Sequence, residues 1–599
     1  MTAISHPDDG RTGQAAQVVD VAEPEAAAPA TPRDWLRSPV LQGGVALLIY
    51  VLAWIPTAFR PIVHHPALAQ LDQKSMDPNF YVWSLRWWPY AIAHGLNPLY
   101  SSQIAAPAGH SLAWVTTVPP LALLATPLTL AAGPVVAFNL LAAAALPVSA
   151  WAAFVLCRRL TGRFWAALVG GAVFGFSSFE MNHGSAGQLN LTYSLLLPIL
   201  AYLILLWRDE SISSRTFVIL AALTMALQFY LFEETFADLT GILLVAFVLG
   251  LVIAGRAHRP EVLRMARVVG IAYGIAAVLA VPYLAYALTS QPPRPARITG
   301  MDLASLVIPR PGRTFGISWL TKAAAGPDAI SAACYVGIPL LVLAILLAVT
   351  SWSSRFVRFL TCMLAFIIVA SIGPILRIEG GRDATLPWAR LFHAPILRNA
   401  YPARLMLFAF LVLAVATALF LAGPARRMVW ARWPLAVLVV VFIVLDTVPI
   451  KVKPHTSVPK FISTQQYRRQ LTRGETVVVV SNVGNAGMLW QAESGFYLRL
   501  AGGFINAGLS HRTDLPRPVQ DLANATPGYV SNFEKYVRRD HVGAILLDAN
   551  HEPRWVGIFW RMGLHGHRLG DVIVYKTQGC KSCKAVSWTD LGKAKPASA

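Results

Sequence analysis

The sequence of 599 residues contains few charged residues: Asp, Glu, Lys and Arg make up only 13% of it, whereas 55% of the residues are hydrophobic. A soluble domain carries about a quarter charged residues, and a single soluble core stops growing near roughly 250–300 residues. The charges stand in short clusters between long apolar runs, as in chains that cross a bilayer repeatedly. The composition excludes an ordinary soluble protein and predicts a polytopic membrane protein.

Several signatures of soluble enzymes are absent as well. The chain has no G-x-x-x-x-G-K-[ST] loop, no H-E-x-x-H pair and no G-x-S-x-G elbow, which excludes the usual nucleotide, zinc-protease and hydrolase sites. It has five cysteines, of which Cys580 and Cys583 form a lone C-x-x-C. A zinc site needs about four ligands, so a local disulfide is the better interpretation of this pair.

The formal net charge of +20 does not indicate nucleic acid as a partner. No nucleic-acid motif is present, and the basic residues lie in short links between apolar runs. Cytoplasmic loops of membrane proteins collect Lys and Arg, so these links are predicted to lie in the cytoplasm. The predicted topology has the N-terminus inside, the C-terminus outside and about eleven spans, since a span needs about 20 apolar residues. The apolar runs are 41–59, 134–156, 164–179, 191–207, 217–232, 236–254, 268–288, 333–349, 356–373, 405–421 and 434–447.

The predicted fold is therefore an α-helical polytopic membrane protein with a small C-terminal α/β domain outside the membrane. Residues 1–38 are polar and rich in Ala and Pro, which predicts a disordered cytoplasmic segment. Residues 39–450 form the transmembrane domain, with a first outer loop at 60–133. Residues 451–599 form the outer domain, because strand-like runs at 476–480, 542–547 and 571–575 alternate with polar stretches.

The first outer loop begins with an acid in a favourable position. Asp77 precedes Pro78, the pattern of a helix start, and Phe80, Trp83 and Trp87 follow at helical spacing. This spacing predicts a helix along the membrane interface with its aromatic rings at headgroup depth. Asp77 is then either a catalytic base or simply the cap of the helix. The apolar run 118–132 that follows is short and interrupted by prolines, so we predict a re-entrant or interfacial helix.

This order of features resembles the GT-C superfamily of membrane glycosyltransferases. Its members follow the first span with an acid that opens a juxtamembrane helix, a Gly-Asn-Pro turn like Gly95–Pro98, and a proline-led dipping helix like that at Pro119–Pro120. The similarity continues at Asn182–Asn190 and at Arg398–Arg404, which is similar to an R-x-P-x-R-like outer motif of the YfhO-like subgroup. Many relatives have two adjacent acids where this chain has Asp77 alone.

The resemblance implies a transferase that takes a sugar from a polyprenyl-phosphate donor on the outer face of the cytoplasmic membrane. The acceptor would be a cell-envelope glycan, lipid or protein. A hydroxyl acceptor needs a base within hydrogen-bond reach, and the leaving phosphate needs cations or donors. We predict Asp77 as the base. Two other functions stay open: a transporter or flippase for a lipid-linked glycan, and a non-catalytic envelope scaffold.

Glu233 and Glu234 lie between two apolar runs almost without a linker, where acids are costly and usually functional. They could assist the base, orient the acceptor or hold a divalent cation, or they could form a salt-bridged turn. No other cofactor is predicted. Arginine suits phosphate because its guanidinium binds it in a bidentate manner, so Arg404 is the first candidate for the lipid phosphate. The remaining predicted substrate-binding residues are Asp72, His110, His183, Gln188, Arg398 and Tyr401.

Overall fold

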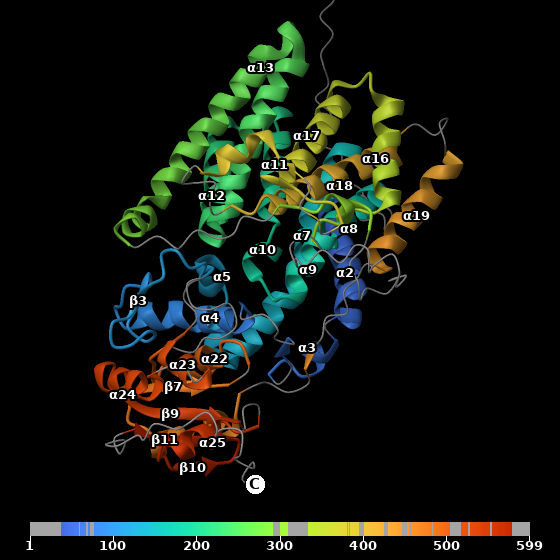
Figure 1. The fold of residues 1–599 in the computed structure, drawn as a ribbon. Helices are drawn as coiled ribbons and strands as arrows, with labels where there is room; N and C mark the ends of the chain where they lie inside the picture. The colour runs from blue at the N-terminus through green and yellow to red at the C-terminus, as the bar shows by residue number, and fades with distance from the viewer. Residues whose placement is uncertain are drawn as a thin grey trace, which may run out of the picture.

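The computed structural model describes a helical bundle joined to a smaller α/β part (Figure 1). The described residues are 38–58, 60–67, 70–71, 77–290, 300–308, 333–379, 381, 384–393, 400–423, 429–445, 452–453, 458–481, 483–503, 517–524, 528–550 and 554–577. The predicted site residues Asp72 and Arg398 and the Cys580–Cys583 pair lie outside these ranges.

All eleven predicted apolar runs are largely helical. Five helices of the described residues are long and apolar enough to cross a membrane, or six if the pair α8–α9, bent by 45°, is counted as one span. The count of about eleven spans stays a prediction. The helices are α2 (Pro39–Ala58), α7 (Pro134–Thr161), α8 (Phe164–Gly175), α9 (Ser178–Ser185), α10 (Leu189–Thr192), α11 (Leu196–Arg208), α12 (Ser214–Leu231), α13 (Glu233–Thr289), α16 (Ile338–Ser351), α17 (Arg355–Ser371), α18 (Met406–Ala422) and α19 (Val429–Leu445).

Helix α13 contains two antiparallel arms rather than one straight rod (Figure 1). Gly255, at φ 69°, breaks it, a conformation that glycine adopts without steric cost. Phe236 of the first arm stacks on Tyr273 of the second with ring centroids 5.3 Å apart. The basic link over residues 255–267 lies between two of the predicted spans. Apart from Gly255 the segment is helical, because its Ala, Arg, Glu and Leu residues favour helix.

The basic links meet at one end of the bundle. Arg159 pairs with Asp209 at 2.9 Å, and Arg208 pairs with Glu261 at 3.3 Å. These contacts join the links that follow α7, α11 and the break in α13. The clustering fits a single cytoplasmic face, although the orientation of the chain across the membrane remains a prediction.

Small residues allow α7, α8 and α18 to approach closely. Gly171 of α8 faces α7 so tightly that a Cβ atom there would lie 2.6 Å from the carbonyl oxygen of Ala150. On the same helix, a Cβ at Gly170 would lie 2.8 Å from the carbonyl oxygen of Ala414 in α18. Such contacts are typical of helix packing in membranes, where small residues bring backbones together.

We therefore expect Gly171→Ala to destabilise the bundle by about 1–3 kcal/mol, the usual cost of overpacking. Gly241→Ala is the matched control, because its Cβ would meet nothing within 4 Å and alanine favours helix by about 0.5–1 kcal/mol. Thermal unfolding of both variants in detergent measures the difference. Equal midpoints for the two variants would contradict the packing described here.

The α/β part contains a five-stranded mixed sheet in the order β10-β11-β9-β7-β8 (Figure 1). The central strand β9 pairs in parallel with β7 and antiparallel with β11. The α/β part also contains four helices: α22 (Ala486–Glu493), α23 (Arg517–Asn524), α24 (Tyr529–Arg539) and α25 (Arg554–Arg561). The strands are β7 (Thr476–Val480), β8 (Arg499–Leu500), β9 (Val542–Asp548), β10 (Gly566–Leu569) and β11 (Val572–Lys576).

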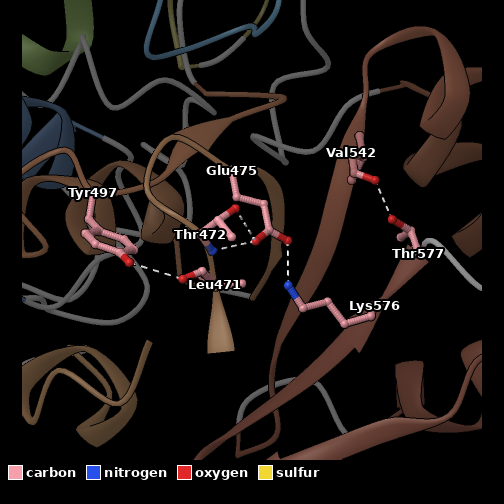
Figure 2. A network of polar contacts seen from close by, with 7 residues as sticks. All are labelled: Leu471, Thr472, Glu475, Tyr497, Val542, Lys576 and Thr577. Carbon is pink, nitrogen blue, oxygen red and sulfur yellow. Dashed lines mark hydrogen bonds and ion pairs between the residues drawn. The ribbon is translucent and has the colours of Figure 1, made fainter. Parts of the chain in front are cut away.

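A polar network fixes the beginning of β7 against its neighbours (Figure 2). The Glu475 carboxylate accepts a hydrogen bond from the Thr472 backbone N–H at 2.8 Å and pairs with the Lys576 ammonium at 2.7 Å. Nearby, the Thr577 hydroxyl donates to the Val542 carbonyl. These contacts connect the entry to β7 with the end of β11 and the start of β9.

The first outer loop and the α/β part form one unit. The backbone of residues 103–106 continues the sheet at its β8 edge: the Leu500 N–H donates to the Gln103 carbonyl at 2.8 Å and the Ala106 N–H to the Leu500 carbonyl at 2.9 Å. Helix α4 (Asp77–Ala93) packs on α22, where the Trp83 Nε1–H donates to Gln491 Oε1 at 2.7 Å. The two regions also share one hydrophobic core.

This packing corrects the expectation for the aromatic residues of α4. Phe80, Trp83 and Trp87 are buried at 4%, 0% and 0% exposure and are covered by protein instead of lying at headgroup depth. Phe496 meets Trp83 and Trp87 edge-on, with ring centroids 5.9 and 5.5 Å away. Helical spacing of aromatic residues indicates that a face is covered, but not whether lipid or protein covers it.

Glu493 at the end of α22 joins the α/β part to the bundle. Its carboxylate accepts a hydrogen bond from the Val135 N–H in the first turn of α7, and Arg86 of α4 is close enough to act on its charge. Burial nevertheless raises the pKa of Glu493 above its usual value, because burial disfavours the charged form.

The raised pKa of Glu493 predicts a pH dependence of stability. A carboxyl with a folded-state pKa above its unfolded value stabilises most at low pH, and this contribution is lost as the pH rises through the folded pKa. Glu493→Gln keeps an acceptor for Val135 and carries no charge, so it should unfold at a higher temperature than the wild type near neutral pH. The difference should vanish near pH 4. Thermal unfolding at several pH values checks this, and a less stable variant at neutral pH would contradict it.

Candidate active site

Asp77 stands at the start of α4 and is held by a segment distant in sequence. The Gln188 side chain donates from Nε2 to Asp77 Oδ2 at 2.6 Å. On its other side, Gln188 Oε1 lies 2.6 Å from His183 Nδ1. The three predicted site residues therefore form one hydrogen-bonded row from α4 to α9, with Gln188 in the middle. The carboxylate is oriented by a side chain and does not depend on helix geometry alone.

Tyr81 lies on α4, one helical turn after Asp77, and belongs to the same part of the site. Its hydroxyl donates to Asn190 Oδ1 at 2.6 Å, and the ring is 4% exposed. Burial, with the Asp77 charge as the second cause, raises the pKa of Tyr81 well above its ordinary value. The phenol therefore remains protonated at physiological pH and acts as a donor.

Glu234 and Arg404 form an ion pair at the same end of the bundle. The Arg404 guanidinium donates to Glu234 Oε2, and the Tyr401 backbone N–H donates to Glu234 Oε1 at 2.9 Å. The side chains of Glu234 and Arg404 are each 17% exposed. The guanidinium also lies over the rings of Tyr401 and Phe232, at 4.5 and 5.2 Å from their centroids, which adds cation–π attraction.

Glu233 is bound separately from Glu234. Its Oε1 lies 2.5 Å from the Tyr283 hydroxyl, which also contacts the Ala113 carbonyl of the first outer loop. The charges of Asp77, Arg404 and Glu233 all act on Tyr81. The two adjacent acids thus face different partners, and Tyr81 lies within electrostatic reach of both halves of the site.

The structure brings together seven of the predicted site residues: Asp77, Glu233, Glu234, His183, Gln188, Tyr401 and Arg404. His110 is half-buried in β3 (His110–Ser111), where burial lowers its pKa. Within the described part of the chain, no hydrogen bond or ion pair connects His110 to this group.

Sequence reasoning missed several polar residues of this region. Tyr81 could have been found, because it lies one turn from Asp77 on the same helical face. The same rule applies to Asp238, one turn after Glu234 and within reach of the Arg404 charge. Glu180 directly follows the apolar run 164–179 and so had the same signal as Glu233 and Glu234. Its partner Ser194 lies inside the run 191–207 and had none.

The described residues contain no group of three or more His, Cys, Asp and Glu side chains placed to hold a metal ion. Glu233 and Glu234 point to separate partners, Tyr283 and Arg404. A shared cation between these two acids would require both contacts to rearrange.

Comparison with known proteins shows what the fold is. No family model matches the chain, and no curated protein matches it in sequence. The cryo-EM structure of the arabinofuranosyltransferase AftD from Mycobacteria is similar in fold, with a TM-score of 0.53 and 13% identity. The similarity covers 93% of this chain but only 40% of AftD. An oligosaccharyltransferase from Archaeoglobus fulgidus gives a TM-score of 0.49 at 12% identity, covering 87% of this chain and 70% of that one. The chain therefore shares its fold with AftD, in agreement with the fold that its sequence resemblance to the GT-C superfamily implied.

The Glu234–Arg404 pair permits a direct test of the site's electrostatics. Removing one partner of a buried pair costs about 3–5 kcal/mol, since a charge is left unpaired, whereas removing both costs much less. We expect Glu234→Gln and Arg404→Met each to lower stability by about 3 kcal/mol, and the double variant to recover at least half of the summed loss.

The Arg159–Asp209 pair at the opposite end is the matched control. Its side chains are 39% and 45% exposed, and exposed pairs contribute less than about 1 kcal/mol. Thermal unfolding of the single and double variants in detergent gives the coupling energy of each pair. Additive effects at Glu234 and Arg404 would show that the pair is not coupled as described.

Proposed function

We propose that this chain is a membrane glycosyltransferase that moves a sugar from a polyprenyl-phosphate donor to a cell-envelope glycan, lipid or protein on the outer face of the membrane. The observation that carries the proposal is the Asp77 carboxylate, held by Gln188 at 2.6 Å in the same cluster as Arg404. The GT-C fold supports it. Because the chain matches only 40% of AftD, the sugar, the acceptor and the reaction itself belong to the proposal.

In the proposed reaction Asp77 acts as the general base. It takes the proton of the acceptor hydroxyl while that oxygen forms a bond to the anomeric carbon of the sugar. The bond from this carbon to the phosphate oxygen breaks, and the electron pair leaves with the polyprenyl phosphate. The carboxylate is suited to this role because Gln188 fixes its orientation before substrate arrives.

Arg404 is the proposed partner of the lipid phosphate. Its guanidinium keeps its position through Glu234 and the Tyr401 ring, while Nε is buried and has no hydrogen-bond partner. A preorganised cation with an unused donor stabilises negative charge that develops on a leaving group. Glu233 and Glu234 are proposed as supporting residues, and a divalent cation at the site remains part of the proposal.

The decisive experiment assays purified protein with a panel of radiolabelled polyprenyl-phosphate pentoses and hexoses and with envelope acceptors. We expect Asp77→Asn to lower kcat about 10²–10⁴-fold, the usual contribution of a general base, without loss of thermal stability. Asp209→Asn, a carboxylate at the opposite end, is the control and should retain full activity.

An unchanged rate in Asp77→Asn would remove this residue from the mechanism. If no donor supports sugar transfer but the protein moves a lipid-linked glycan across the membrane of proteoliposomes, the result would instead support a flippase. Absence of both would support a scaffold.

A further inference from the structure

Two buried side-chain atoms of the site, one of His183 and one of Glu180, have no hydrogen-bond partner. His183 is 5% exposed and Glu180 is 0% exposed. His183 Nε2 and Glu180 Oε2 are both buried without a hydrogen-bond partner. Buried polar groups are normally paired, and an unpaired one in a well-packed protein needs an explanation.

The hydrogen-bond row fixes the protonation of the His183 ring. Asp77 offers only acceptors to Gln188, so the Gln188 amide must point its NH₂ group toward Asp77 and its oxygen toward His183. An amide oxygen can only accept, so His183 Nδ1 carries a hydrogen. In the neutral ring Nε2 then carries a lone pair.

His183 and Glu180 lie on the same face of α9. They are three positions apart on this helix and therefore share one face. Their partners Gln188 and Ser194 both belong to the segment that follows α9. The two unpaired atoms thus lie in one polar layer, next to the row that ends at Asp77.

We propose that His183 Nε2 is a binding site for a hydroxyl group of the carbohydrate substrate, with the unpartnered Glu180 carboxyl on the same helix as a second polar group. This inference rests on the proposed glycosyltransferase function and defines a part of its substrate site. The ligand must supply a hydrogen-bond donor to His183 Nε2, because this atom can only accept. A sugar ring carries several hydroxyl donors, whereas an ionised phosphate has only acceptors and is excluded from this position.

Binding at His183 also acts on the base. A hydroxyl that donates to Nε2 polarises the ring, which strengthens the Nδ1–H bond to Gln188 and, through the amide, the bond from Gln188 to Asp77. His183 and Gln188 are therefore positioning residues for Asp77. Substrate occupancy and orientation of the carboxylate are coupled through three side chains.

A spectroscopic test uses wild-type protein with ¹⁵N-labelled histidine, the His183 signals being assigned with His183→Phe. We expect the resting spectrum to show Nδ1–H and an unprotonated Nε2. Methyl arabinofuranoside and methyl mannopyranoside at millimolar concentration should shift the Nε2 resonance, and inorganic phosphate should not. A resting Nε2–H, a shift with phosphate alone, or no shift with either glycoside (a position filled by water only) would each overturn the assignment.

A kinetic test separates this inference from the proposed function. Loss of one neutral hydrogen bond should raise the acceptor or donor KM of His183→Phe about three- to tenfold, whereas a lost base lowers kcat in Asp77→Asn. His567→Phe, an exposed residue of β10, is the control and should match the wild type. Gln188→Leu should lower kcat and raise KM together.

The possible outcomes are distinct. If Asp77→Asn loses activity and His183→Phe keeps wild-type constants, the function stands and the hydroxyl site is refuted. If the wild type transfers no sugar at all, the function falls, and the glycoside titration still decides whether His183 binds a hydroxyl.

Discussion

The site depends on one constraint: hydrocarbon offers no hydrogen bonds, so polar groups within a membrane bundle must find partners in the protein. Asp77 receives a donor from Gln188, Glu233 from Tyr283, and Glu234 from Arg404. These donors come from three different segments of the chain. Pairing the acids therefore brings together α4, the turn after α9, both arms of α13 and the residues before α18, which is why residues distant in sequence form one cluster.

The elements were easier to predict than their contacts. Apolar runs identify helices because every span must satisfy its own backbone, and the strands β7, β9 and β11 are identified by short, continuously apolar runs between polar stretches. Asp77, Glu233 and Glu234 were recognisable because acids beside apolar runs are costly. Gln188 was predicted as a site residue, but its contact with Asp77 was not, and Tyr283 was not predicted at all, because these partners lie 111 and 50 residues from the acids they contact. Glu180 was overlooked, although it directly follows the apolar run 164–179 and so had the same signal as Glu233 and Glu234.

The burial of the aromatic residues of α4 shows what a local sequence pattern does not predict. Its aromatic stripe is equally compatible with a lipid surface and with a protein surface, because both are apolar. In the structure, protein covers this stripe. The Trp83 indole donates a hydrogen bond to Gln491, and Phe496 packs on the rings of Trp83 and Trp87. This packing places the α/β part directly on the helix that begins with Asp77. The rigidity of that helix, and so the position of its carboxylate, depends on a domain that begins hundreds of residues later in the chain.

Arg404 appears at first to be occupied, since Glu234 already neutralises it. A guanidinium, however, carries five donors in a fixed plane, and the contact to Glu234 uses Nη1 while Nε has no partner. Stacking on Tyr401 and Phe232 fixes the plane in which the remaining donors lie. In the proposed reaction the lipid phosphate binds at Nε and leaves the ion pair intact, whereas a broken pair would leave Glu234 as an unpaired buried charge. In the proposed reaction Glu234 orients the Arg404 guanidinium. Glu233 and Glu234 therefore have different roles, although they are adjacent in sequence.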